Sequence, residues 1–165
     1  MKTRQKGIIS IDTGIKYLDH LIMNFCKYAF LEIKMNPVPR NKTPRAIIKY
    51  ATEYLGKTMN LSIENISTVG IGYASVPSDE SLAKVSLDLK NNCQYCNVEL
   101  GMKGRQIDGM QREDLEYFFR LLSKNLKACL HIKVEYGAYD KHKVDAVVKA
   151  LAVAWKQATN RYEKK

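Results

Sequence analysis

The sequence contains few of the residues from which metal centres and disulfide frameworks are built. Its 165 residues include only three histidines and four cysteines. No apolar run approaches the roughly 20 residues that a transmembrane helix requires, and the N-terminal segment lacks the apolar core of a signal peptide. These absences predict a cytoplasmic protein without a membrane span.

The cysteines do not form a recognisable zinc site. Cys93 and Cys96 make one C-x-x-C pair, whereas a four-ligand site needs a second pair, and Cys26 and Cys129 stand alone in apolar segments. Because Cys93 and Cys96 lie in an alternating pattern, we predict buried thiols on a strand.

The composition favours one compact domain with a basic surface. Hydrophobic residues make up 45% of the chain, and a chain of this length can bury a substantial core. We therefore expect residues 1–165 to form a single domain. The formal net charge is +10, and residues 1–57 hold most of it. This excess indicates an anionic partner such as nucleic acid, an acidic protein or a phosphorylated metabolite.

The hydrophobic periodicity predicts an order of elements that occurs twice. Each half contains an amphipathic helix, a strand, a loop and a second helix, and three strands are expected between residues 67 and 100. In the first half, Thr43 is a suitable N-cap for a helix that Gly56 can end. Three segments match three others at an offset of about 100 residues: 15–22, 29–35 and 41–51 match 115–122, 128–134 and 141–151. We predict an internal duplication with half-repeats of about 1–65 and 66–165.

His142 and Asp145 lie three residues apart at the start of the last predicted helix. Side chains at this spacing share one face of a helix, and imidazole and carboxylate groups bind metals. A single histidine is more often a structural or surface residue. The pattern alone therefore leaves both interpretations open.

Three longer segments carry a resemblance to a known family. They are DTGIKYLDHLI (12–22), PSDESLAKVSLDL (77–89) and NLKACLHIKVEYGAYDKHKVDAVVKALAVAWKQA (125–158). In this order, and from Ile11 to Ala158, the chain resembles imidazoleglycerol-phosphate dehydratase, the manganese enzyme of histidine biosynthesis. The resemblance implies an α+β fold of two tandem α/β repeats, a sandwich like that of some ribosomal-protein domains. It also implies trimers that assemble into a 24-subunit shell, with metals and active sites at subunit junctions.

The resemblance implies site residues at the matching motif positions. The metal-ligand positions are His20, His131, His142 and Asp145, with aspartate in place of the family's glutamate. The PMDEAL motif corresponds to Pro77, Ser78, Asp79, Glu80, Ser81 and Leu82, and Asp79 and Glu80 are the residual catalytic candidates. Lys149 matches the lysine that meets the substrate phosphate.

Several family positions carry different residues in this chain. The DHHTVED signature is replaced by residues 40–46, so two histidine ligands and one glutamate ligand are absent, and Lys141 replaces another histidine. The phosphate-binding arginine of the SGRP motif and the first strand of the family have no counterpart. Fixed positive charges repel a dication, so we expect no cofactor, or at most one weakly bound manganese or zinc ion.

These departures lead us to expect a non-catalytic homologue that serves as a binding or structural subunit. RNA or a ribonucleoprotein is the expected partner, because four basic residues surround one helix start: Arg40, Lys42, Arg45 and Lys49. One alternative is a residual or hetero-oligomeric dehydratase with an incomplete metal site, in which a full-length paralogue supplies ligands. Another is a phosphate-ester sensor that depends on Lys149. The resemblance is compatible with a homotrimer or a larger assembly.

Overall fold

A computed structural model describes residues 8–38 and 41–160 of the chain. The elements are β1 (Ile9–Ser10), α1 (Lys16–Ala29), β2 (Ile33–Lys34), α2 (Pro44–Ser62), β3 (Ile71–Ser78), β4 (Ser81–Asp88), β5 (Cys96–Glu99), β6 (Gln106–Ile107), β7 (Met110–Gln111), α3 (Arg112–Leu126), β8 (Cys129–Tyr136) and α4 (Asp140–Ala158). This mixture of helices and sheet confirms the predicted α+β class. No helix in the described ranges is both long and apolar enough to cross a membrane.

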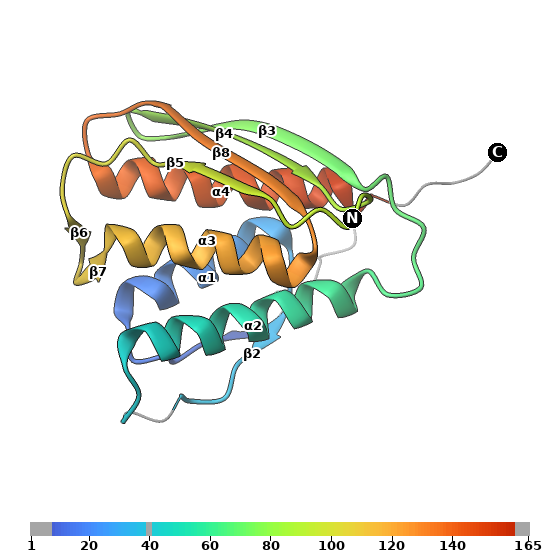
Figure 1. Ribbon diagram of the computed structural model, residues 1–165, viewed down its shortest axis with the longest axis horizontal. Helices are drawn as coiled ribbons and strands as arrows, with labels where there is room; N and C mark the ends of the chain where they lie inside the picture. The colour runs from blue at the N-terminus through green and yellow to red at the C-terminus, as the bar shows by residue number, and fades with distance from the viewer. Residues whose placement is uncertain (1–7, 39–40, 161–165) are drawn as a thin grey trace, which may run out of the picture.

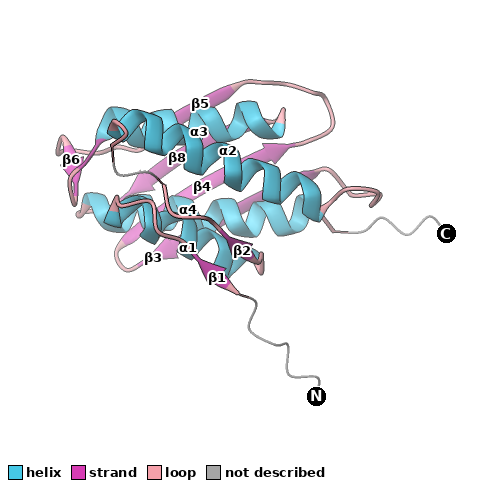
Figure 2. Cartoon of the chain, turned by 90° about the horizontal axis from the view of Figure 1, so that it is seen from below, coloured by secondary structure: helices cyan, strands magenta, loops and turns pink. Residues whose placement is uncertain are grey.

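The main sheet has the strand order β3-β4-β8-β5. Strands β3, β4 and β8 are antiparallel neighbours, whereas β5 runs parallel to β8. Helices α3 and α4 cover one face of this sheet, and α1 and α2 form a further layer beneath them (Figure 1). The short strands β1 and β2 pair in parallel on the far side of that helical layer (Figure 2).

The same order of elements occurs in both halves of the chain. β1, α1, β2 and α2 correspond to β5, α3, β8 and α4, and each half contains one parallel strand pair. This recurrence supports the internal duplication and the half-repeats that we propose. The second half also has the β3–β4 hairpin, which has no counterpart in residues 8–38 and 41–62.

Helix α2 begins where the sequence predicts but ends later. The Thr43 side chain accepts a hydrogen bond from the Ala46 backbone, and Pro44 occupies the first turn. The predicted end at Gly56 is wrong, because the helix continues to Ser62. A Cβ atom on Gly56 would lie 2.8 Å from the Cβ of Asn125. The glycine therefore permits α2 and α3 to pack closely instead of ending the helix.

Strand β3 lies directly against the backbone of α4. Four alanines at intervals of about one helical turn along α4 are fully buried: Ala146, Ala150, Ala154 and Ala158. A Cβ atom on Gly72 would lie 1.8 Å from the backbone oxygen of Ala154. Small residues on both elements thus bring the β3–β4 hairpin and α4 together, which positions the turn of the hairpin beside the start of the helix.

The prediction for the cysteines is wrong in one respect. Cys93 and Cys129 form a disulfide that joins the loop before β5 to the start of β8, while Cys26 and Cys96 are free thiols. Burial raises the pKa of the Cys96 thiol to about 11, so this thiol stays protonated at neutral pH. The pairing could not be read from the sequence because the partners are 36 residues apart.

We expect the Cys93→Ser substitution to lower the free energy of unfolding by about 4 kcal/mol, because it releases the loop that the disulfide closes in the unfolded chain. Denaturant unfolding of the oxidised protein measures this loss. Titration of the denatured parent without reductant should find two free thiols. Four free thiols would contradict the disulfide.

Candidate functional site

Most of the side chains singled out by the sequence converge at the N-terminal end of α4. They come from α1, from the turn between β3 and β4, and from α4 itself: His20, Asp79, Glu80, His142, Asp145 and Lys149. We call this group the α4-start cluster. It consists of two histidine–carboxylate pairs, the further carboxylate of Asp79 and one lysine.

The first turn of α4 is held in place by Asp140 and Lys143. The Asp140 carboxylate accepts hydrogen bonds from the backbone N–H groups of Lys103 and Gly104 at 3.1 and 2.7 Å. A carboxylate at this position is also stabilised by the positive end of the helix dipole. Lys143 is 3% exposed and donates to Asp140 and to the backbone oxygen of Gly101. These contacts fix the residues that follow on the helix.

His20 and Asp145 form the first pair, between α1 and α4. His20 Nε2 lies 3.0 Å from Asp145 Oδ1 and 3.0 Å from Asn24 Nδ2. The His20 ring stacks on Tyr17 with ring centres 5.7 Å apart. The sequence predicted that Asp145 and His142 would bind the same metal ion. The Asp145 carboxylate instead contacts the imidazole of His20 on α1.

His142 and Glu80 form the second pair. His142 Nδ1 lies 2.6 Å from Glu80 Oε2, and Asp79 Oδ2 lies 3.6 Å from His142 Nε2. Glu80 Oε1 accepts hydrogen bonds from the backbone N–H groups of Ala138 and Tyr139. The backbone hydrogen bond from Tyr139 and the contact with His142 lower the pKa of Glu80 well below its usual range. The hydrogen bond with Glu80 raises the pKa of His142.

The pair between His142 and Glu80 should make stability depend on pH. Because the pKa of Glu80 is lowered, its contribution is present above the ordinary value of 4.5 and is lost as the pH falls through the folded-state pKa. Because the pKa of His142 is raised, its contribution is complete below 6.5 and is lost as the pH rises through the folded-state pKa. The pair therefore stabilises the fold most between pH 4.5 and 6.5.

Unfolding of the parent and of a Glu80→Gln variant across this range measures the effect. We expect the difference in unfolding free energy to be largest in that window and to shrink on both sides. A difference in unfolding free energy that does not change with pH would show that this pair does not cause the pH dependence of stability.

Lys149 occupies the other side of the cluster. Its Nζ donates to the Ser78 hydroxyl at 2.9 Å and lies 5.7 Å from the centre of the Tyr28 ring. Lys141, one turn before Asp145, is ion-paired with Asp108 at 2.8 Å and lies over the Tyr17 ring. The hydrogen bond with Asp108 raises the pKa of Lys141, so its positive charge is retained.

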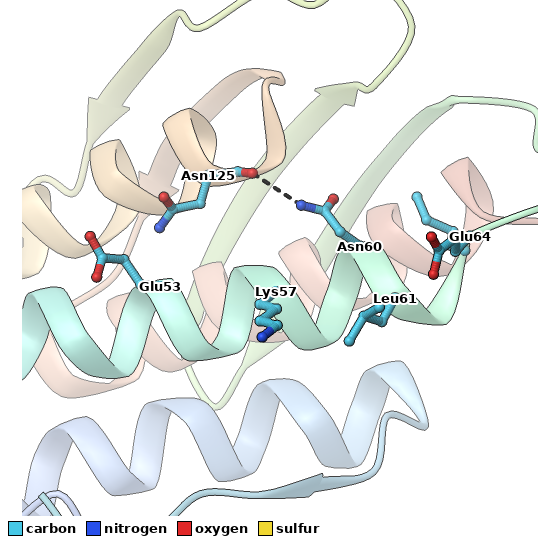
Figure 3. Close-up of a pocket in the computed structure, with 7 residues that line it drawn as sticks. Glu53, Lys57, Asn60, Leu61, Glu64 and Asn125 are labelled. Carbon is cyan, nitrogen blue, oxygen red and sulfur yellow. Dashed lines mark hydrogen bonds between the residues drawn. The ribbon is translucent and has the colours of Figure 1, made fainter.

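A groove of about 470 Å³ lies elsewhere, between the C-terminal parts of α2 and α3 (Figure 3). Its polar lining includes Glu53, Lys57 and Glu64, and Asn60 donates a hydrogen bond to the Asn125 backbone oxygen at 3.1 Å. The lining contains none of the predicted site residues. We therefore place the candidate site at the α4-start cluster.

Comparison with known proteins identifies the family. The family model described as imidazoleglycerol-phosphate dehydratase matches residues 13–155. A protein of Chlorobium phaeobacteroides (strain BS1) with that name is 33% identical over 162 residues, covering 93% of this chain and 78% of the relative. The chain belongs to the imidazoleglycerol-phosphate dehydratase family. A relative of the same name from Methanosarcina barkeri is 29% identical over 154 residues, covering 92% of this chain and 80% of the relative.

Two solved structures show the same fold. Imidazoleglycerol-phosphate dehydratase from Staphylococcus aureus superposes with a TM-score of 0.85 at 21% identity, over 97% of this chain and 92% of that one. The enzyme from Pyrococcus furiosus, solved in complex with (S)-C348, has a TM-score of 0.82 at 27% identity, over 97% and 87% of the two chains.

The expectation of a non-catalytic subunit that contacts RNA is wrong. The reported relatives are named as dehydratases, and nothing in these comparisons indicates RNA. The basic residues at the start of α2 are also partly neutralised. Arg45 is ion-paired with Asp114 at 3.0 Å and lies over the Tyr117 ring, and Lys49 lies 3.9 Å from Glu53. Lys42 is exposed, and Arg40 lies outside the described residues.

His131 is separate from the α4-start cluster. It lies on β8 between the buried residues Leu130 and Ile132, so its side chain is on the outer face of the sheet. There it packs beside Tyr95, with ring centres 5.4 Å apart. The structure thus brings together three of the four predicted ligand residues and leaves His131 on an exposed surface.

The donors within one chain do not fit the manganese centre that the resemblance to the family implies. Residues 8–38 and 41–160 contain no group of three or more His, Cys, Asp or Glu side chains that could hold a metal ion. His20 and Asp145 contact each other directly, and the ammonium group of Lys141 lies on the same helix turn. A fixed ammonium disfavours a dication at short range.

Sequence reasoning missed three residues of the site. Asn24 follows His20 by four positions, and this spacing could have placed it on the same helix face. Ser78 stands where the family's PMDEAL motif has methionine, and Tyr17 lies three residues before His20 on α1, with its ring stacked on the His20 ring. The Tyr17 hydroxyl is buried and has no hydrogen-bond partner in the described part of the chain.

Proposed function

We propose that this chain is a subunit of an imidazoleglycerol-phosphate dehydratase, a carbon–oxygen lyase of histidine biosynthesis, with a metal site that is incomplete in one chain. The observation that carries this proposal is the convergence of His20, His142 and Lys149, with their partners, at the start of α4 in a chain of this family. Activity is then residual in the chain alone, or complete in a mixed assembly with a family member that carries the missing metal ligands.

The α4-start cluster suits the proton transfers of a dehydration. This reaction removes a carbon-bound proton and releases a hydroxyl group as water, so one group must accept a proton and another must donate one. His20 and His142 are the two imidazoles, and a carboxylate orients each of them. The raised pKa of His142 favours its charged form, which suits the donor. Lys149 supplies positive charge for the phosphate of the ester.

Two observations support a mixed assembly. The donors of one chain are too few for the family's metal centre, and His131 is exposed on the outer face of the sheet, where a neighbouring subunit has access to it. An active site at a subunit junction accounts for both. The metal ligands would then come from a second protein, which leaves His20 and His142 available for the proton transfers.

Complementation tests this function. The chain is expressed in a bacterium that lacks its own imidazoleglycerol-phosphate dehydratase, alone and together with a relative in which only the two histidines that match His20 and His142 have been replaced. We expect growth without histidine in the mixed case, and slow growth or none with either protein alone. Absence of growth in all three cases, with both proteins soluble and associated, would contradict the proposal.

A further inference from the structure

Lys149 differs from Lys141 and Lys143, which precede it on α4, in the groups that contact its ammonium group. Lys141 is paired with Asp108 at 2.8 Å, and Lys143 with Asp140 at 3.1 Å. Lys149 forms no ion pair with any carboxylate of the described residues. Its partners are the neutral Ser78 hydroxyl and the face of the Tyr28 ring. The charge of Lys149 is therefore held in place without being neutralised.

The Ser78 hydroxyl accepts one hydrogen bond, and its own hydrogen remains available for donation. Its side chain is buried, with the residue 4% exposed, at the end of β3. The hydroxyl oxygen accepts a hydrogen bond from the Lys149 ammonium, so the hydroxyl hydrogen remains available for an acceptor beside the ammonium. No other bond of this hydroxyl occurs within the described residues. An oxyanion placed against Lys149 can therefore receive two donors.

The hydrogen bond also restricts a flexible side chain. A lysine side chain loses considerable rotamer freedom when a ligand fixes it. Because the Ser78 hydroxyl and the Tyr28 ring already hold the ammonium, less of that freedom remains to be lost on binding. The family motif has methionine at position 78. Its thioether is a weaker acceptor than a hydroxyl and would hold the Lys149 ammonium less firmly.

We propose that Ser78 is a positioning residue for Lys149, and that the two together bind the phosphate group of the substrate. The identity of the substrate rests on the proposed function, whereas binding of a phosphate group does not. The pair explains how this chain can hold a phosphate ester although it lacks the arginine of the family's SGRP motif.

Titration calorimetry with inorganic phosphate, on the full chain, tests the proposal. Ser78→Ala should weaken phosphate binding about 10-fold, because it removes a hydrogen bond with a charged group. Ser78→Thr keeps the hydroxyl and should restore binding. Lys149→Gln should weaken binding at least as much, and the double variant should lose less than the sum of the two single losses, since Ser78 acts in part through Lys149.

Lys156→Gln is the matched control. Lys156 lies two turns further along α4, with its Nζ 4.1 Å from the centre of the Phe30 ring. Its removal takes the same charge from the same helix, so phosphate binding should stay at the parent level. A loss equal to that of Lys149→Gln would show a general charge effect and overturn the proposal. Parent-level binding by a folded Ser78→Ala variant, or no phosphate binding by the parent, would overturn it as well.

The outcomes also separate this proposal from the proposed function. Phosphate binding that depends on Ser78, in a chain that supports no turnover in any assembly, would retain the binding pair and reject the dehydratase. Turnover with the same KM in the parent and in Ser78→Ala would retain the dehydratase and reject the role of Ser78. If both proposals hold, Ser78→Ala raises KM about 10-fold and leaves kcat nearly unchanged.

Discussion

Replacing His142 by glutamine should lower the turnover of imidazoleglycerol phosphate by about 100-fold or more, the usual effect of losing a positioned acid–base group. The amide cannot carry a proton between pH 5 and 8. Glu80 remains fixed by the backbone N–H groups of Ala138 and Tyr139, so the substitution removes the imidazole and leaves its orienting group in place. The measurement is kcat at saturating substrate in the most active assembly.

A folded variant that lacks a lysine elsewhere on α4 serves as the control for this experiment. Lys156→Gln lies on the same helix outside the α4-start cluster and should retain the parent kcat. A His142→Gln variant that is folded and turns over at the parent rate would exclude His142 from the proton transfers. A rise in KM alone would assign it to binding instead.

Gly72→Val should lower the free energy of unfolding by about 3 kcal/mol or more, because the new side chain cannot fit between β3 and α4. The first added carbon would lie 1.8 Å from the Ala154 backbone oxygen, and a helix backbone cannot move away as a flexible side chain can. Either β3 must shift from α4 or the helix must bend. Denaturant unfolding measures the loss.

Ser75→Val is the matched control for Gly72→Val. Ser75 lies on the same strand with its side chain on the solvent face, so the same valine should change the unfolding free energy little. Equal stability of the two variants would mean that β3 does not contact α4 as closely as the structure indicates.

The fold could be predicted largely from periodicity, since the helix and strand patterns and the Thr43 cap depend on neighbouring residues. The predictions that were wrong depend on contacts between segments that are distant in the sequence. Glycine is typical of a helix end, so Gly56 suggested one. Only the close packing of Asn125 on α3 against Gly56 explains why a glycine stands inside α2, which continues to Ser62. The disulfide partner of Cys93 likewise depends on where β8 lies.

Several residues of the candidate site could be predicted from the sequence, but their pairing could not. Helical spacing places His142 and Asp145 near each other, and this is correct. Their partners come from other elements: Glu80 from the β3–β4 turn and His20 from α1. The charge excess of residues 1–57 suggested RNA because ion pairs such as Arg45 with Asp114 join distant parts of the chain and cannot be counted from composition.

The most direct test of the central claim is a turnover assay with purified protein. Imidazoleglycerol phosphate is incubated with the chain and manganese, alone and in a mixed assembly with a relative that lacks only the two histidines matching His20 and His142. Nuclear magnetic resonance follows the loss of the carbon-bound proton and the formation of the dehydrated product. We predict product in the mixed assembly at a rate above the sum of the separate proteins, and its loss with His142→Gln. No product in any sample that binds the substrate would contradict the account.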